Sequence, residues 1–426
     1  MNRLRAFLLL TAVALPAAGQ SFAITNARIF DGERLIPRGT VVVKDGKIES
    51  VGADVKIPEG VELFNAGGGT LLPGLIDAHT HAFLGGLDRA LLFGVTTELD
   101  MGTLPAVAAH LREEQSRPGG ASGRADLFSA GNLATAPGGH GTQFGLPIPT
   151  LSRPEETQAW VDARIAEGSD YIKIVIEDLS AYGKSRPTLS WETVAALVKA
   201  AHARGKLAVA HVSTAASARQ AIEVGMDGLV HLFTDRAADP GLAKLAAERK
   251  AFVIPTLTVL ESANGIAAGR TLVEDVRLRG FLVPSEVEHL KTFFPVKTAG
   301  GMPVALDTVR QLAAAGVPVL AGSDTPNPGT IHGASLHREM EMLVQAGLTP
   351  GQALAAATSA TAKAFRLTDR GRIAPGLRAD LVLVAGDPLK DITDTRNIVR
   401  VWKGGVAVNR EAGRPPAPAP APARPR

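Results

Sequence analysis

Alternation of short apolar runs with amphipathic segments between residues 75 and 364 is the feature that most restricts how this 426-residue chain folds. Each run has the length of one strand, and helical stretches such as Trp191–Arg204 and Pro240–Lys250 lie between several of them. Strands that alternate with helices form parallel sheets, and eight such units predict an α/β fold, a closed (β/α)8 barrel of the TIM type. The eight runs are Leu75–Thr80, Val95–Met101, Leu127–Ala130, Tyr171–Ile176, Leu207–Val212, Gly228–Phe233, Phe252–Leu257 and Val317–Gly322.

The sequence on both sides of this region has strand character without helices. Asp45 and Gly46 separate two of the runs and predict a tight hairpin turn. We expect residues 20–72 and 369–412 to combine into one small β-sandwich module, with the barrel spanning residues 73–368. The runs are Ile24–Phe30, Gly39–Lys44, Lys47–Val51, Ala379–Val384, Val399–Trp402 and Val406–Asn409.

The two ends of the chain predict segments outside the folded modules. Residues 1–19 have a basic start, an apolar run and small residues before a cleavage site, which is the pattern of an export signal. The run Ala6–Leu15 is too short to cross a bilayer comfortably, so we expect a periplasmic or extracellular protein with no stable membrane insertion after cleavage. An uncleaved anchor is the alternative. Residues 413–426 are rich in Pro and Ala and predict a disordered tail.

The composition excludes several functional classes. The chain has no cysteine, so disulfides, thiolate nucleophiles and cysteine-based metal sites are excluded, and any metal must be held by nitrogen and oxygen ligands. The net charge is only +3 and aromatic residues make up 4%, which argues against a nucleic-acid partner. We expect a small-molecule substrate, and a homo-oligomer remains open.

A histidine pair in the stretch Pro73–His81, with the sequence PGLIDAHTH, is the most specific motif. Side chains at positions i and i+2 of a strand point the same way, so His79 and His81 face one side. At the carboxyl end of a barrel strand they are able to hold one metal ion. Because a lone His-x-His pair is weak evidence, the prediction depends on ligands elsewhere in the chain.

Lys173 lies inside the apolar run Tyr171–Ile176. A buried lysine is unfavourable unless its charge is removed or paired, and burial lowers its pKa so that the neutral amine becomes available. A neutral amine reacts with carbon dioxide to give a carbamate, whose two oxygens can bridge two cations. The alternative is an edge-strand lysine whose amine reaches water.

Three further candidates stand at the ends of predicted strands. His211 and His231 each end an apolar run, and their separation is about one barrel repeat, while Asp324 follows the last run. A lone strand-end histidine is usually a core residue and an aspartate often caps a turn, but active sites of this barrel lie where all these strand ends meet. The predicted metal ligands are therefore His79, His81, Lys173, His211, His231 and Asp324.

Two residues in loops are candidates for substrate binding. His140 lies in a glycine-rich loop after the third run, where it would overhang the site and polarise a substrate carbonyl; the alternative is a role in shaping the loop. Tyr182, after the fourth run, is a weaker candidate for substrate contact.

These motifs resemble the amidohydrolase superfamily over residues 24–410, and most of all its prolidase-like and imidazolonepropionase-like members with a carboxylated lysine. The segment Gly371–Leu381, GRIAPGLRADL, is typical of members whose β module is split between the chain ends. The resemblance implies a binuclear centre, usually of zinc. The implied ligands are His79, His81 and Asp324 for one ion and His211 and His231 for the other, with Lys173, carboxylated by CO2, as the bridge.

The predicted function is metal-dependent hydrolysis of an amide bond, in a dipeptide or an N-acyl amino acid, by hydroxide formed on two divalent ions. Asp324 and His231 are the expected catalytic residues, with Asp324 acting as general base and then acid, and His140 stabilising the oxyanion. An esterase, a lactonase or a phosphotriesterase would use the same centre, and a non-catalytic binding protein is an alternative of another class. A deaminase fits less well, because Thr214 stands where those enzymes commonly carry a glutamate.

Overall fold

The computed structural model describes residues 21–415, apart from residues 84, 118–119, 146, 238, 268 and 295–299. The predicted export signal, residues 1–19, lies outside the described residues, as does most of the predicted tail. Within the described residues, no helix combines the length and the apolarity needed to cross a bilayer.

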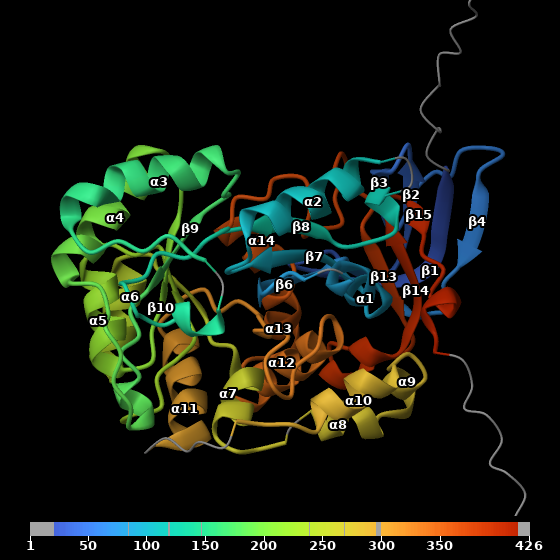
Figure 1. Ribbon diagram of the computed structural model, residues 1–426. Coiled ribbons are helices and arrows are strands. Elements are labelled where there is room, and N and C mark those ends of the chain that lie inside the picture. The colour runs from blue at the N-terminus through green and yellow to red at the C-terminus, as the bar shows by residue number, and fades with distance from the viewer. Residues whose placement is uncertain are drawn as a thin grey trace, which may run out of the picture.

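Two parallel sheets form the middle of the chain and confirm the predicted α/β alternation (Figure 1). One sheet has the order β6-β7-β8 and the other β12-β11-β10-β9, so neighbours in sequence are neighbours in space. All pairs within them are parallel, as expected where helices connect consecutive strands. The strands are β6 (Leu75–Thr80), β7 (Val95–Asp100), β8 (Asp126–Ser129), β9 (Ile172–Val175), β10 (Ala208–His211), β11 (Gly228–Val230) and β12 (Phe252–Ile254).

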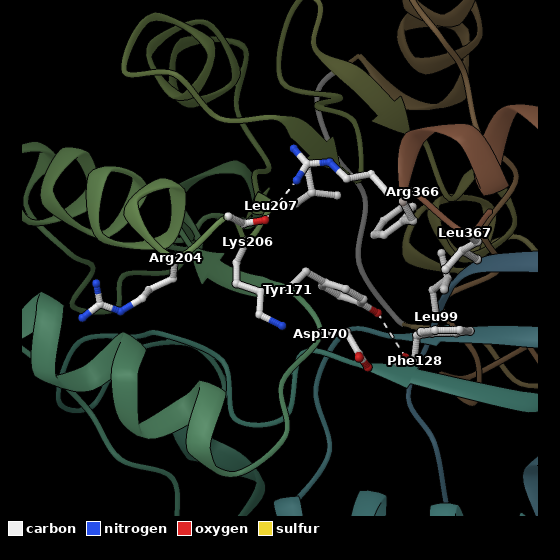
Figure 2. Close-up of a pocket in the computed structure, with 11 residues that line it drawn as sticks. Leu99, Phe128, Asp170, Tyr171, Arg204, Lys206, Leu207, Arg366 and Leu367 are labelled. Atoms are coloured by element: carbon white, nitrogen blue, oxygen red, sulfur yellow. Dashed lines mark hydrogen bonds between the residues drawn. The ribbon is translucent and has the colours of Figure 1, made fainter.

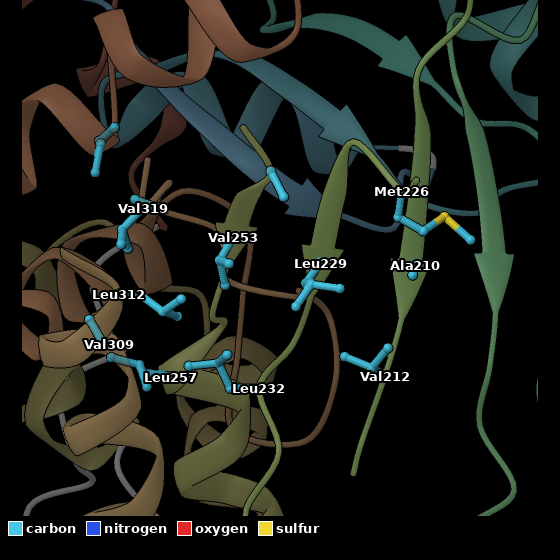
Figure 3. Packing of buried hydrophobic residues seen from close by; sticks show 14 of the residues in the cluster. Ala210, Val212, Met226, Leu229, Leu232, Val253, Leu257, Val309, Leu312 and Val319 are labelled. Atoms are coloured by element: carbon cyan, nitrogen blue, oxygen red, sulfur yellow. The ribbon is translucent and has the colours of Figure 1, made fainter. Parts of the chain in front are cut away.

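Helices pack around these strands and enclose the core in Figure 3. Val309 and Leu312 of α11 face Val253 and Val319 there, beside Leu257. Burial of such aliphatic side chains between strand and helix is the main stabilising contribution to an α/β layer. The helices are α1 (Gly86–Leu92), α2 (Pro105–Ser116), α3 (Thr157–Ala166), α4 (Trp191–Ala203), α5 (Ala215–Glu223), α6 (Pro240–Glu248), α7 (Leu257–Ala263), α8 (Arg270–Glu274), α9 (Val276–Arg279), α10 (Pro284–Leu290), α11 (Gly301–Ala314), α12 (Ala334–Gln345), α13 (Pro350–Ala356) and α14 (Ser359–Ala364).

The eighth predicted strand, Val317–Gly322, is wrong as a regular strand. This segment is extended, but among the described residues it forms a single isolated bridge, parallel from Val319 to Val253 of β12. The C-terminal end of α13 explains the interruption, because the Ala356 carbonyl accepts the N–H of Ala321 at 3.0 Å. The next carbonyl, Ala357, accepts the N–H of Ile76 on β6 at 2.7 Å. A non-local contact therefore takes the donors that a regular ladder would use.

Isolated contacts also link the two parallel sheets. Ala134, after β8, forms a parallel bridge to Ile174 of β9. On the other side, Thr80 at the end of β6 forms a parallel bridge to Thr325, and the Asp324 N–H donates to the His79 carbonyl at 2.8 Å. These links bring the ends of β6 and the segment after Gly322 side by side.

Strands from both ends of the chain meet in one eight-stranded sheet of order β15-β14-β13-β5-β1-β2-β3, with β4 paired to β1. The predicted hairpin at Asp45-Gly46 is present, with φ of 49° and 75°, as a two-residue turn with both residues left-handed requires. A division of this sheet into the two layers of a sandwich stays a prediction. The strands are β1 (Phe22–Phe30), β2 (Leu35–Lys44), β3 (Lys47–Gly52), β4 (Glu62–Asn65), β5 (Thr70–Pro73), β13 (Leu381–Val384), β14 (Ile398–Lys403) and β15 (Val406–Ala407).

A buried lysine joins this sheet to the parallel strands. Lys403 of β14 is fully buried, and its Nζ lies 2.7 Å from Asp126 Oδ2 of β8 and 3.2 Å from Asp380 Oδ2. A buried ammonium requires such partners, since an unpaired charge in the interior is strongly unfavourable. The eight-stranded sheet is thus held against the strands that carry the site.

Candidate metal centre

His79, His81 and Asp324 meet at the carboxyl end of β6. The Nε2 atoms of His79 and His81 each lie 3.1 Å from Asp324 Oδ1. One ligand atom from each of the three residues lies within 4.8 Å of the others, which is a spacing able to hold a metal ion. The sequence prediction that these three side chains converge is therefore confirmed.

The polar atoms of this trio fit a cation. His79 Nδ1, His79 Nε2 and Asp324 Oδ1 are buried and accept or donate no hydrogen bond in the described structure. The Nδ1 of His81 lies 2.9 Å from the Gly102 carbonyl, an acceptor, so Nδ1 carries the proton and the Nε2 lone pair faces Asp324. Histidine metal ligands are typically oriented by such a bond from the other ring nitrogen. Buried lone pairs that converge without a donor are the arrangement that a divalent cation satisfies.

Electrostatics keeps His79 and Asp324 in a ligand-competent state. Burial would lower the pKa of His81, but Asp324 and Asp100 outweigh it and raise the pKa, so a metal ion there competes with a proton. Burial lowers the pKa of His79 to about 3, against the attraction of Asp324, so the imidazole is neutral. Burial opposes ionisation of Asp324, but His79 and His231 outweigh it and hold the pKa of Asp324 well below its usual range. Neutral imidazole and ionised carboxylate are the forms that bind metal ions.

Of the other predicted ligands, His231 lies beside the trio and His211 lies beside His231. The ring centroids of His211 and His231 are 4.4 Å apart, and His231 lies 4.8 Å from His79. His231 Nδ1 is 4.0 Å from Asp324 Oδ2. Lys173 is only 2% exposed, and burial lowers its pKa to about 7, although Asp324 and other carboxylates oppose the shift. Lys173 lies on β9, which pairs with β10, the strand that ends at His211.

Of the two predicted substrate contacts, His140 lies beside this cluster. The His140 ring centroid is 4.9 Å from that of His211, and burial, followed by repulsion from His211, lowers the pKa of His140 to about 3. Tyr182 is half-buried; burial, Glu177 and Asp324 raise its pKa. A role of either side chain in substrate binding stays a prediction.

The structure adds Glu177, which the sequence reasoning missed. Its side chain is 1% exposed, and Oε2 lies 3.6 Å from His211 Nε2. Burial alone would raise the pKa of Glu177, but His211, Ser213 and the Leu179 N–H outweigh it and lower the pKa. The available signal was an acidic residue directly after the apolar run that ends at Ile176.

A chain of contacts also fixes His231 and was not foreseen. His231 Nδ1 lies 2.7 Å from the Thr256 hydroxyl, and Thr256 immediately precedes α7. Glu339 of α12 is fully buried and accepts the Leu257 N–H at 2.9 Å and the Thr258 N–H at 2.8 Å. Thr258 Oγ1 donates to the same carboxylate at 2.8 Å. Glu339 thus clamps the start of α7 and thereby positions the hydroxyl that holds His231.

Three residues of this region have left-handed backbone conformations: His231 with φ of 69°, Thr256 with φ of 49° and Asp324 with φ of 53°. Such conformations cost roughly 1–3 kcal/mol for residues other than glycine, and they cluster at functional sites. His231 follows β11, Thr256 follows β12 and Asp324 follows the extended segment Val317–Gly322. This strain independently marks the strand ends as the functional region.

The fold and the cluster define a class of proteins in which parallel strands of an α/β fold carry metal ligands at their carboxyl ends. The Amidohydrolase family profile matches residues 70–408, and the chain belongs to this family. An imidazolonepropionase of Cereibacter sphaeroides is 30% identical over 391 residues, which cover 84% of this chain and 91% of that protein.

Solved structures agree with the family. A Xaa-Pro dipeptidase with methionine bound in its active site is 25% identical, with a TM-score of 0.72, and the match covers 91% of this chain and 99% of that one. A protein from Bifidobacterium longum, provisionally named a prolidase, is 26% identical with a TM-score of 0.72 over 92% and 95% of the two chains. The chain is therefore a hydrolase acting on carbon–nitrogen bonds, from a family that generally uses metal ions.

Proposed function

We propose that this enzyme hydrolyses the amide bond of a dipeptide or an N-acyl amino acid at a binuclear metal centre. The observation that carries the proposal is the convergence of His79 Nε2, His81 Nε2 and Asp324 Oδ1 without hydrogen-bond donors. The similarity to a Xaa-Pro dipeptidase supports a substrate whose scissile amide bond is formed by the nitrogen of a C-terminal amino acid.

The scaffold in this proposal is one closed (β/α)8 barrel. The parallel bridges Ala134–Ile174, Val253–Val319 and Thr80–Thr325 support closure, because they connect the two parallel sheets through the extended segment before Asp324. In such a barrel the active site lies at the carboxyl ends of the strands, where the candidate ligands stand. The sheet formed by both chain ends would be the accessory β-sandwich.

His79, His81 and Asp324 would hold one ion, and His211 and His231 the other. Lys173 would bridge the two as a carbamate, formed when its neutral amine adds to carbon dioxide and releases one proton. The lowered pKa of Lys173 supports this reaction, because the neutral amine is then well populated near neutral pH. Nitrogen and oxygen ligands suit zinc. When bound, the ions would supply a water of lowered pKa and polarise the scissile carbonyl.

The protein's own groups then move the proton. Asp324 Oδ1 would bind an ion together with His79 and His81, so Oδ2, 4.0 Å from His231 Nδ1, takes the proton of the attacking water. Asp324 delivers the same proton to the leaving nitrogen, acting first as base and then as acid. His231, whose Nδ1 is held by Thr256, would act in this step as a ligand beside Asp324, and His140 donates a hydrogen bond to the developing oxyanion.

The Asp324→Asn variant tests this assignment. We expect kcat/KM for the best substrate in a screen of dipeptides, N-acyl amino acids, lactones and aryl esters to fall about a hundredfold or more. Asp178→Asn, whose carboxylate contacts only Ser180 in the described structure, is the matched control and should keep its activity. A loss of less than about tenfold in Asp324→Asn contradicts the role. A preference for esters over amides contradicts the substrate class.

The Lys173→Met variant tests the bridge. Methionine suits a buried strand, so the variant should fold at least as stably as the unmodified protein. We expect it to lose one of two tightly bound ions per chain and to lose incorporation of carbon-13 from labelled bicarbonate. Two ions retained in Lys173→Met contradict the bridging role.

We also propose that residues 1–19 direct export. A mature N-terminus near residue 20 in the periplasmic fraction would support this proposal, and full-length protein in the cytoplasm would contradict it.

A further inference from the structure

A cavity of about 310 Å3 lies at the ends of β9 and β10 opposite to the metal centre (Figure 2). Its lining includes Asp170 and Tyr171, which lead into β9, and Lys206, which leads into β10. His211 stands at the other end of β10. The size is at the lower end of the range found for small-molecule sites.

The floor of the cavity is apolar and held in place. The Tyr171 ring stacks edge-on against Phe365 with centroids 5.1 Å apart. The Tyr171 hydroxyl donates to the Asp100 carbonyl at 2.7 Å, which fixes the ring between the strands. Phe128 and Leu367 complete the surface on the other side, as Figure 2 shows. An apolar group that entered would meet a preformed surface rather than one that must reorganise.

Two cations stand at the rim without acidic partners. Within the described part of the chain, no carboxylate lies within ion-pair distance of Lys206 or of Arg366. Arg366 is oriented by one contact, from Nη1 to the Gly205 carbonyl at 2.9 Å, which leaves its other donors free. Arg204 differs, because Asp162 pairs with it at 2.8 Å. The rim therefore offers positive charge to a ligand.

One carboxylate faces the same opening. Asp170 Oδ2 accepts from Arg112 at 2.6 Å and from the Ser129 N–H at 2.8 Å, whereas Oδ1 makes no hydrogen bond among the described residues. Figure 2 shows the Lys206 ammonium and the Asp170 carboxylate directed toward the space beside Tyr171. A simple anion would be repelled by Asp170, and a simple cation by Lys206. A group that carries both charges fits both.

We propose that this cavity binds a free α-amino acid with an apolar side chain. The carboxylate of the ligand pairs with Lys206 and Arg366, and its ammonium donates to Asp170 Oδ1. Charge-assisted hydrogen bonds of this kind are the strong ones in protein sites. The side chain of the ligand covers Phe128 and Leu367 and removes apolar surface from water. The site is separate from the metal centre, and its binding does not depend on the proposed hydrolysis.

Calorimetric titration of the full chain with leucine tests the proposal. We expect saturable binding of one leucine per chain. Two analogues separate the charges: 4-methylpentanoate lacks the ammonium and 3-methylbutylamine lacks the carboxylate, and each should bind at least about tenfold more weakly. Absence of saturable leucine binding overturns the proposal, and so does equal binding of either analogue.

Variants assign the binding to this cavity. Lys206→Gln should weaken the binding of leucine at least about tenfold. The matched control is Lys199→Gln, which replaces an exposed lysine on α4 and should leave leucine binding unchanged. Leu367→Trp, which fills the cavity without touching a charge, should abolish binding even if Lys206→Gln misfolds. Asp324→Asn should bind leucine normally. Unchanged affinity in Lys206→Gln, or binding lost in Asp324→Asn, overturns the proposal, with melting temperatures confirming that each variant is folded.

Discussion

Replacement of Thr256 by valine removes the side chain that, among the described residues, hydrogen-bonds to His231 Nδ1, and it changes little else. Valine has nearly the shape of threonine and is also β-branched, so the left-handed backbone at this position, with φ of 49°, is equally strained in both proteins. Thr256 is fully buried, and no water replaces the lost hydroxyl without rearrangement. The substitution therefore isolates the 2.7 Å contact to His231.

The expected loss of metal affinity follows from the ring nitrogen of His231 that is left without a hydrogen-bond partner. For His231 to present Nε2 to a metal ion, Nδ1 must carry the proton and donate it to the Thr256 hydroxyl. A buried donor left without a partner costs about 1–3 kcal/mol, which corresponds to roughly five- to 150-fold in an equilibrium constant. Loss of such a supporting contact typically costs about 10–100-fold in metal affinity or activity. We expect a loss of metal affinity within that range for Thr256→Val.

Competition with a chromophoric chelator measures the affinity for zinc, and kcat/KM is measured on the same preparations. Thr256→Ser keeps the hydroxyl and should stay within about threefold of the unmodified protein, which separates a missing hydrogen bond from altered packing. A Thr256→Val protein whose metal affinity and kcat/KM both stay within about threefold would refute the reasoning.

Two further predictions test features remote from the centre. His337 of α12 is fully buried, and burial followed by repulsion from Arg396 lowers its pKa to about 3. The unfolded chain binds a proton below about pH 6.5 that the folded chain does not, so this contribution to stability is complete above pH 6.5 and is lost as pH falls toward 3. The free energy of unfolding is measured with urea, in the presence of a chelator, for the unmodified protein and for His337→Gln. The difference between the two proteins should be about 2 kcal/mol smaller at pH 5 than at pH 6.5. A difference that does not change with pH would contradict the pKa shift. Lys403→Met removes the buried ammonium from Asp126 and Asp380, which keep Arg370 and Arg378 as partners. The variant should lower the free energy of unfolding by about 2 kcal/mol while kcat/KM stays within twofold, and unchanged stability would show that Lys403 does not hold the sheet in place.

The local pattern of apolar and turn residues in the sequence predicted those strands and turns whose conformation depends on neighbouring residues. β6 has the predicted bounds, Leu75–Thr80, and the Asp45-Gly46 hairpin is present because its conformation depends on two adjacent residues. The extended segment Val317–Gly322 has the same apolar pattern but no regular ladder. The Ala321 N–H is taken by the carbonyl of Ala356 at the end of α13, and no local pattern reports which distant backbone group competes for a donor.

The convergence of three candidate ligands was predictable for a different reason. In a barrel the first and last strands are neighbours, so the expected topology alone placed Asp324 beside His79 and His81. Their supports were not predictable in this way. Thr256 precedes α7, and the contacts of Glu339 with Leu257 and Thr258 depend on how α12 packs against α7. The hydrophobic pattern shows which face of a helix is buried, but not which polar group it meets.

The left-handed backbone at His231, Thr256 and Asp324 connects the candidate ligands with the residues that support them. Glycine would adopt these conformations without strain, yet the chain places a ligand, its hydrogen-bond partner and the proposed base there. The strain must then be offset by contacts that are rigid in their own right. The Glu339 clamp on α7 is one such contact, since three donors from two residues fix a single carboxylate. Rigidity around the site therefore comes from helices that carry no candidate ligand. A sequence motif locates the candidate ligands, but their geometry depends on how these helices pack.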